Sequence, residues 1–425
     1  MKIVIFVCVL VVFVFGISIQ YGIADDFDWP RWRGLNGDGI SMETDWNPEA
    51  LDGNPKILWK MNVGVGYANV VIKKNRLYTM GTRERKFTLF CLNAENGKEI
   101  WRYQFESLED PQSTPTLHDK HVYALSKDGI LLCLNAKNGK LQWMKDLVSE
   151  YDAVKPFYGF AASPLIEGDL IILTVNNSGL ALDKKTGDKL WGSDKPPENL
   201  PGQNTGTHYA TPVIYDYEGK RYATISNYEG LHSVEVKTGK VLWTYEWDPL
   251  GSTRSAYATG PVIFDNKVFI TRYEKEGCVL LDIGGGNPKV VWDNQNMSSD
   301  TSSPILINGY IYGCEGGPQD GRGSLRCLDV DTGELMWEKD FRTEEDVSVV
   351  TVSLIAADGK LIILEDDGTL HIAKVTPSSY QEICSCDVLE GERKIRHFWT
   401  YPVLCNGLIY CKNYPGDLVC IDVRK

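Results

Sequence analysis

Alternating apolar and polar residues form a pattern that repeats along most of this chain. The copies "FTLFCLNAENGKEIWRYQF" from residue 87, "GILLCLNAKNGKLQWMKDL" from 129 and "GSLRCLDVDTGELMWEKDF" from 323 share one layout. In each, apolar residues alternate over five or six positions, an Asn-Gly or Thr-Gly turn follows, and alternation resumes through a tryptophan. This layout predicts a β-hairpin, because period-two patterning fits strands and Asn-Gly fits tight hairpin turns.

A second pair of short apolar runs precedes each hairpin, so every copy predicts four antiparallel strands. Eight copies are present, beginning near residues 87, 129, 178, 229, 277, 323, 368 and 416, and the last is truncated. The repeat tryptophans lie 42 to 52 residues apart, at Trp59, Trp101, Trp143, Trp191, Trp243, Trp292 and Trp337. Four-stranded units with this period are typical of propeller blades, which bury both sheet faces only by stacking around an axis. The sequence therefore predicts an all-β fold, an eight-bladed β-propeller of four-stranded antiparallel blades.

The two ends of the predicted propeller complement each other. The last copy runs from Gly416 to Lys425 and stops without its outer strand. Residues 54–64, "NPKILWKMNVG", have the outer-strand pattern but no inner strands before them. We therefore expect 54–64 to complete the last blade and close the ring, which leaves no open sheet edge at the seam. A single-domain propeller would then occupy residues 54–425.

Two segments precede the propeller. Residues 1–24 contain an early lysine, an apolar run and a small-residue end. This pattern predicts a cleaved export signal, with retention as a membrane anchor as the alternative. Residues 25–53, which include "DWPRWRGLNGDGIS", form a lead-in segment that is expected to cross one face of the disc.

The lead-in segment combines tryptophan, arginine and glycine, which are common in loops that bind ligands. We expect Trp29 and Trp32 to pack on the propeller, and Arg31 or Arg33 to bridge to acidic loops. Ligand binding by this segment is the alternative. Its glycines allow the chain to bend.

Net charge limits the classes of partner, and the positions of the cysteines indicate the state of their thiols. A formal net charge of −13 argues against nucleic acid or an anionic membrane as a partner. Of the 11 cysteines, four share one repeat position, where a small buried residue is expected: Cys91, Cys133, Cys327 and Cys420. Two pairs on neighbouring strands are candidate disulfides, Cys314 with Cys327 and Cys411 with Cys420, because exported chains tolerate such bonds.

The segments "LNAENGKEIW", "LNAKNGKLQW", "LDVDTGELMW" and "VEVKTGKVLW" resemble the tryptophan-docking motif of the PQQ-like β-propeller repeat family. The resemblance covers about residues 54–425. It implies that each indole docks between adjacent blades. The family includes quinoprotein alcohol dehydrogenases, which hold pyrroloquinoline quinone (PQQ) with Ca²⁺, and non-enzymatic members such as the outer-membrane protein assembly factor. The motif therefore identifies the fold but gives little evidence about enzymatic activity.

Ligand sites on propellers usually lie where loops enter the innermost strands, and this chain places ionisable and aromatic residues there. The residues that precede the "SP" or "TP" dipeptide of each inner strand are expected to form a ring around the axis, which we name the axial mouth. Arg254 and Arg396 also reach it and suit a carboxylate or phosphate. Its candidate residues are Tyr67, Gln112, Phe160, His208, Tyr209, Arg254, Tyr257, Asp300, Arg396, His397 and Trp399.

Three interpretations of the axial mouth stay open. Asp300 is the candidate catalytic base of a dehydrogenase, while His208 with His397 is a weaker candidate for a metal pair. The loop 192–209 is long enough to form a lid. Alternatively, all these groups line a wet axial channel without chemistry.

Two departures from the family's enzymes weigh against catalysis. The chain has no adjacent Cys-Cys pair to cover a quinone, Cys384-Ser385-Cys386 being the nearest, and no Cys-x-x-Cys-His haem site. We therefore predict a monomeric, periplasmic or secreted binding or assembly scaffold of the bacterial envelope. Its partner is an envelope protein or a small molecule at the mouth. The alternative is a PQQ-dependent dehydrogenase acting on alcohols or sugars.

Overall fold

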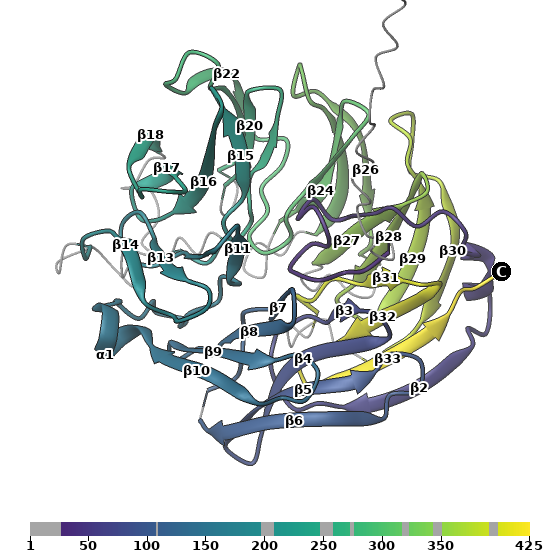
Figure 1. The fold of residues 1–425 in the computed structure, drawn as a ribbon. Coiled ribbons are helices and arrows are strands. Elements are labelled where there is room, and N and C mark those ends of the chain that lie inside the picture. The colour runs from purple at the N-terminus through teal and green to yellow at the C-terminus, as the bar shows by residue number, and fades with distance from the viewer. Residues whose placement is uncertain are drawn as a thin grey trace, which may run out of the picture.

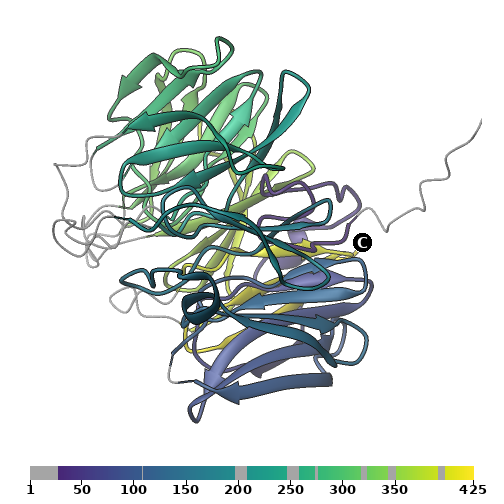
Figure 2. The same ribbon diagram turned by 60° about the vertical axis from the view of Figure 1, so that its left-hand side comes forward.

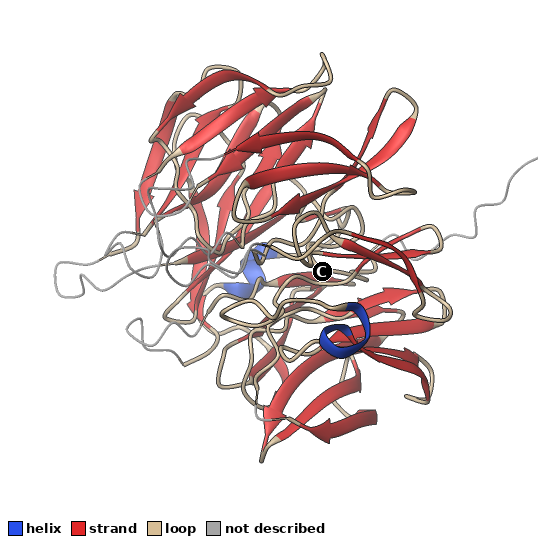
Figure 3. Ribbon diagram, turned by 90° about the vertical axis from the view of Figure 1, so that its left-hand side faces the viewer, coloured by secondary structure: helices blue, strands red, loops and turns tan. Residues whose placement is uncertain are grey.

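The computed structural model describes residues 27–107, 109–196, 208–246, 258–272, 276–316, 323–342, 351–390 and 398–425. These residues form eight sheets arranged in a ring, seven of four strands and one of five (Figure 1). The predicted all-β, eight-bladed propeller is confirmed. Nearly all ordered elements are strands (Figure 3). No helix in these ranges is long and apolar enough to cross a membrane.

The blades follow the chain order, and the first strand of each lies nearest the centre (Figure 1). The strands of blades 1 to 4 are β3 (Val71–Lys73), β4 (Arg76–Arg83), β5 (Lys86–Asn93), β6 (Glu99–Glu106); β7 (Thr116–His118), β8 (His121–Leu125), β9 (Ile130–Asn135), β10 (Leu141–Asp146); β11 (Leu165–Glu167), β12 (Leu170–Leu173), β13 (Leu180–Asp183), β14 (Lys189–Gly192); and β15 (Ile214–Tyr217), β16 (Lys220–Ser226), β17 (Gly230–Glu235), β18 (Val241–Glu246).

The strands of blades 5 to 8 are β19 (Val262–Phe264), β20 (Lys267–Thr271), β21 (Cys278–Asp282), β22 (Lys289–Asn294); β23 (Ile305–Ile307), β24 (Tyr310–Glu315), β25 (Ser324–Asp329), β26 (Leu335–Asp340); β27 (Val352–Ala357), β28 (Lys360–Glu365), β29 (Thr369–Lys374), β30 (Glu382–Asp387); and β31 (Val403–Cys405), β32 (Leu408–Lys412), β33 (Asp417–Asp422), β2 (Ile57–Asn62). Helix α1 (Leu147–Tyr151) follows β10 and is capped by the Asp146 carboxylate.

Blade 8 joins the two ends of the chain. Strand β2 pairs antiparallel with β33, with Trp59 opposite Cys420 and Asn62 opposite Asp417. The two strands lie side by side at the rim, coloured purple and yellow in Figure 1. The predicted closure of the ring by residues 54–64 is confirmed.

Tryptophans of the outer strands dock each blade onto the next. The indole N–H of Trp101 donates to the carbonyl of Ala136 in the following blade at 3.0 Å, and that of Trp59 donates to Ala94 across the seam at 2.9 Å. Trp143, Trp191, Trp292 and Trp337 make the equivalent bond. Trp243 is buried but makes no such bond within the described residues.

The repeat cysteines lie in cross-strand rows between a tyrosine and a tryptophan. Cys91 pairs with Tyr78 and Trp101, and Cys420 pairs with Tyr410 and Trp59. Burial raises the pKa of the Cys420 thiol to about 12. These thiols are therefore neutral core groups, as the repeat position predicts.

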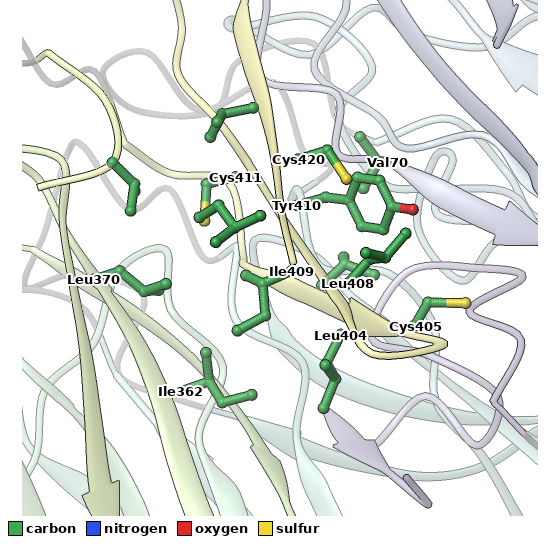
Figure 4. Packing of buried hydrophobic residues seen from close by; sticks show 14 of the residues in the cluster. Val70, Ile362, Leu370, Leu404, Cys405, Leu408, Ile409, Tyr410, Cys411 and Cys420 are labelled. Atoms are coloured by element: carbon green, nitrogen blue, oxygen red, sulfur yellow. The ribbon is translucent and has the colours of Figure 1, made fainter. Parts of the chain in front are cut away.

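Both candidate disulfides are wrong, because all ten described cysteines are free thiols. Cys411 pairs with Val419 and Cys420 with Tyr410, so the two thiols point to opposite faces of the sheet (Figure 4). Cys314 pairs with Leu325, two residues from Cys327. Such diagonal neighbours lie about 7–8 Å apart, beyond the usual Cα spacing of a disulfide.

The lead-in segment packs along one face of the disc and ends on blade 7. Strand β1 (Ile40–Ser41) pairs parallel with β27, which makes blade 7 the five-stranded sheet. The 3-10 helix η1 (Pro48–Leu51) follows and contacts β30, burying Leu51 completely. On this blade Cys384 takes the tryptophan position and donates to the Pro48 carbonyl at 3.1 Å. The lead-in therefore fills the place of the missing indole.

Candidate functional site

A belt of hydroxyl groups links the inner strands around the axis. The Asn69 N–H donates to the Thr114 hydroxyl at 3.0 Å, and the Thr114 N–H donates to the Ser163 hydroxyl at 2.9 Å. The Ser163 N–H donates to the Thr211 hydroxyl at 2.9 Å, and the Gly260 N–H donates to the Ser303 hydroxyl at 2.9 Å. The Ser or Thr of the "SP" and "TP" motifs therefore holds neighbouring blades at a fixed spacing beneath the axial mouth.

Aromatic side chains stack at the axial mouth between blades 1 and 8. Tyr67 precedes β3, and its ring stacks on Trp399 with centroids 4.7 Å apart and planes inclined by 19°. The ring of Tyr414 lies 4.5 Å from that of Tyr67. The Tyr67 N–H also donates to the Pro111 carbonyl at 2.8 Å, next to the half-buried Gln112. The structure thus brings two of the candidate residues, Tyr67 and Trp399, together and adds Tyr414.

Lys412, at the end of β32, lies beneath this stack and is 1% exposed. Its ammonium group donates to the main-chain carbonyl of Gly66, and burial lowers its pKa to about 7. Sequence analysis missed this residue. Aligning the repeats on their tyrosines gives the signal, because the same position holds Met80, Leu125 and Cys314 in other blades.

The other described mouth candidates do not all face the axis. Phe160 is 2% exposed and belongs to the core between blades 2 and 3. His208 is also buried, and desolvation lowers its pKa to about 3, so the imidazole is neutral at physiological pH. The Tyr209 hydroxyl accepts the Tyr158 N–H at 3.2 Å, and its pKa is raised by burial to about 12.

Asp300, the candidate base, is 4% exposed. Its main-chain carbonyl accepts the Ala258 N–H at 3.2 Å. The Asp300 carboxylate adds to burial in raising the pKa of the Cys314 thiol on β24. Four further candidates, Arg254, Tyr257, Arg396 and His397, lie outside the described residues, as does most of the loop 192–209.

The family's cofactor, PQQ with Ca²⁺, needs a flat slot between apolar surfaces and several oxygen ligands. Tyr67 and Trp399 are already stacked on each other, so no planar molecule fits between their rings. Among the described residues, no group of three or more His, Cys, Asp or Glu side chains could hold a metal ion. Tyr67 and Trp399 are therefore not the two faces of a quinone slot in this structure.

A ring of eight four-stranded blades, docked by repeated tryptophans and closed by an N-terminal strand, defines the class as PQQ-like propellers. The family model described as "Outer membrane protein assembly factor BamB" matches residues 49–158 and 112–339. Together these ranges cover more than half of the chain. The chain therefore belongs to this family.

Relatives of two kinds are similar in sequence. BamB of Shewanella oneidensis is 23% identical over 310 residues, which is 72% of this chain and 70% of that protein. Quinoprotein alcohol dehydrogenase PedH of Pseudomonas putida is 28% identical over 145 residues, which is 32% of this chain. That match spans only 23% of the dehydrogenase.

Solved structures of both kinds share the fold. BamB from Moraxella catarrhalis superposes with a TM-score of 0.64 at 15% identity, covering 87% of this chain and 100% of that chain. Quinohemoprotein alcohol dehydrogenase from Comamonas testosteroni gives a TM-score of 0.66 at 14% identity, covering 93% of this chain and 80% of that chain. At these identities the likeness is one of fold alone.

Proposed function

We propose that this chain is an exported, monomeric propeller that acts as a binding or assembly scaffold in the bacterial envelope, periplasmic or secreted. The observation that carries the proposal is the extent of the match to an assembly factor. It runs over 70% of the Shewanella protein, whereas the match to the dehydrogenase PedH runs over 23% of that enzyme. The sequence match to this enzyme is thus confined to a part of it, while the likeness of fold to a quinohemoprotein alcohol dehydrogenase extends over 80% of that chain.

Exposed aromatic side chains beside the mouth candidate Tyr209 support contact with a protein partner. Phe157 and Tyr158, in the loop that leads from α1 to β11, are 50% and 44% exposed. Their rings meet edge to face at 4.9 Å, and Tyr158 meets Tyr209 at 5.8 Å. Exposed aromatic side chains held by their neighbours provide large contact area at low entropic cost, which favours protein recognition.

Photo-crosslinking tests the scaffold directly. A photoreactive phenylalanine analogue replaces Phe157 at the mouth in the producing cells, and a matched variant carries it at Leu190, which is 53% exposed on β14 at the rim. The proposal expects a defined adduct with one envelope protein from the mouth position only. No adduct, or the same adducts from both positions, would count against a partner at this surface.

A titration of the purified protein with PQQ and Ca²⁺ tests the alternative. We expect no saturable change in absorbance or fluorescence and no dye-linked oxidation of alcohols or sugars. Saturable binding together with turnover would replace the scaffold by a quinoprotein dehydrogenase. The titration uses no envelope partner, so its outcome is independent of the crosslinking.

A further inference from the structure

A cavity lies where the lead-in segment covers the inner strands. The lead-in segment, in purple, runs on the side of the disc that carries the C-terminus (Figure 2). The cavity has a volume of about 250 Å³, and its wall includes Arg31, Trp32, Arg33, Glu167, Thr211 and Arg221. Glu167 ends the inner strand β11, whereas the mouth residues precede the inner strands. None of the mouth candidates lines the cavity, although Thr211 of the hydroxyl belt lies in its wall.

Arg33 is the most deeply buried charge of this cavity, with 6% of its surface exposed. Its Nη2 donates to the carbonyls of Asp38 and Pro304, both at 2.7 Å, and its Nε has no hydrogen-bond partner among the described residues. It also has a positive φ of 60°, a conformation that non-glycine residues adopt at an energetic cost. Backbone conformation and packing therefore hold this guanidinium at the cavity wall.

Arg31 adds a second cation without a carboxylate. Its Nε and Nη2 donate to the Leu35 carbonyl at 3.1 and 2.9 Å. Neither Arg31 nor Arg33 forms an ion pair within the described ranges, so the expected bridges to acidic loops are wrong. Burial lowers the pKa of both guanidinium groups, and it outweighs the opposing effect of the carboxylates of Glu167 and Asp38, neither of which forms an ion pair with them.

The third arginine of the wall differs from these two. Arg221 donates to Glu167 at 2.9 Å and to Asp216 at 2.8 Å, so its charge is balanced. Among the described residues of the wall, Glu167 is the one carboxylate, and it is paired with Arg221. The cavity thus carries two guanidinium groups that form no ion pair within the described ranges, in a molecule whose formal net charge is −13.

A buried cation that forms no ion pair is costly, and an anion in the cavity would offset that cost. Guanidinium groups match the oxygens of carboxylate and phosphate with two parallel N–H donors. The cavity volume is several times the roughly 30 Å³ that one water occupies in the liquid. We propose that this cavity binds a small oxyanion, a carboxylate or a phosphate, between Arg31 and Arg33.

Calorimetry and thermal unfolding of the purified protein test this site with three sodium salts: phosphate, acetate and chloride, compared at equal ionic strength. The proposal expects saturable heat and a rise in Tm with phosphate or acetate, and the stronger of the two identifies the ligand group. It expects no such effect from chloride. Equal effects of all three salts, or no saturable binding in the millimolar range, would overturn it.

Arginine variants locate the binding. Arg31→Gln removes the half-buried cation and is expected to weaken oxyanion binding at least tenfold, as is Arg33→Gln where that variant folds. Arg102→Gln is the matched control, because Arg102 pairs with Glu99 on the outer strand β6, away from the cavity. Unchanged affinity in Arg31→Gln, or an equal loss in Arg102→Gln, would contradict the assignment.

Discussion

Five hairpin-turn glycines lie against an indole from the neighbouring blade: Gly97, Gly139, Gly187, Gly239 and Gly333. A Cβ added to Gly139 would lie 2.6 Å from the Trp101 ring, and one added to Gly97 would lie 2.7 Å from the ring of Trp59. Both glycines also have positive φ, of 70° and 68°. The Gly-Lys turn and the tryptophan are therefore two halves of one contact, made between consecutive copies of the repeat.

Gly139→Ala is expected to destabilise the protein more than Gly168→Ala. Both positions have positive φ, but a Cβ at Gly168 meets nothing within 4 Å. The two variants therefore share the cost of a left-handed residue, about 1–2 kcal/mol, and only Gly139→Ala adds the clash with the indole. We expect the clash to cost a further 1–3 kcal/mol or so in the free energy of unfolding, measured by denaturant titration. Equal losses would show that the indole contact is unimportant.

His371 links stability to pH. Its Nδ1 lies 2.9 Å from Glu382 and its Nε2 lies 3.1 Å from Glu365. Burial alone lowers the pKa of His371, but the hydrogen bonds to the two glutamates outweigh it and raise that pKa. The protonated form is thus favoured in the folded state. Its contribution is complete below the ordinary histidine pKa of about 6.5 and is lost as pH rises through the folded value.

We therefore expect His371→Gln to reduce the free energy of unfolding by about 1–3 kcal/mol near pH 6 and by less near pH 8. Equilibrium unfolding across this range measures the effect. Tyr380→Phe is the control, since it removes only the hydroxyl that donates to Glu382 at 2.8 Å and leaves the histidine in place. A loss that is the same at both pH values would contradict a protonated His371.

At the scale of elements, the repeat pattern predicts what depends on neighbouring residues. Strand alternation, turn residues and indole spacing are local, so the blades and the closing strand β2 follow from sequence. The position of the lead-in does not, because η1 contacts β30 from more than 300 residues away in the chain. Only the absence of a tryptophan near Cys384 hints that another segment is needed there.

Leu51→Ala tests whether the lead-in segment, through η1, takes the place of the missing tryptophan on blade 7. Leu51 is fully buried in the cluster around blades 7 and 8, and truncating such a leucine typically costs about 2–5 kcal/mol. Leu35→Ala lies in the same lead-in segment but at a side chain that is 45% exposed, so a change within about 0.5 kcal/mol is expected. Thermal and denaturant unfolding compare the two. Similar values would show that the lead-in is not part of the core.

At the scale of the whole molecule, the disc has two faces with different chemistry. The mouth presents the aromatic stack of Tyr67 and Trp399 above the buried Lys412, while the lead-in face holds the arginine-lined cavity. The sequence predicts the mouth because the "SP" and "TP" motifs mark where inner strands begin. The sequence does not predict that Arg31 and Arg33 donate to main-chain carbonyls, or that the Tyr67 side chain stacks on Trp399. Both contacts depend on segments that meet only when the propeller closes.

Closure itself makes the seam the interface on which the other blades depend, since a propeller blade has two apolar faces that only neighbours can cover. Trp59→Ala removes the bond to Ala94 and the packing against Tyr410, whose ring centroid lies 6.1 Å from the indole. We expect a loss of about 3–5 kcal/mol in unfolding free energy, with faster hydrogen exchange of β2 and β33 than of β9 and β10. Lys60→Ala, at an exposed position of the same strand, should leave both unchanged. If exchange increased equally in all blades, the seam would be no more critical than any other interface. Protection that fails first at β2 would instead show that the ring opens where the two ends of the chain meet.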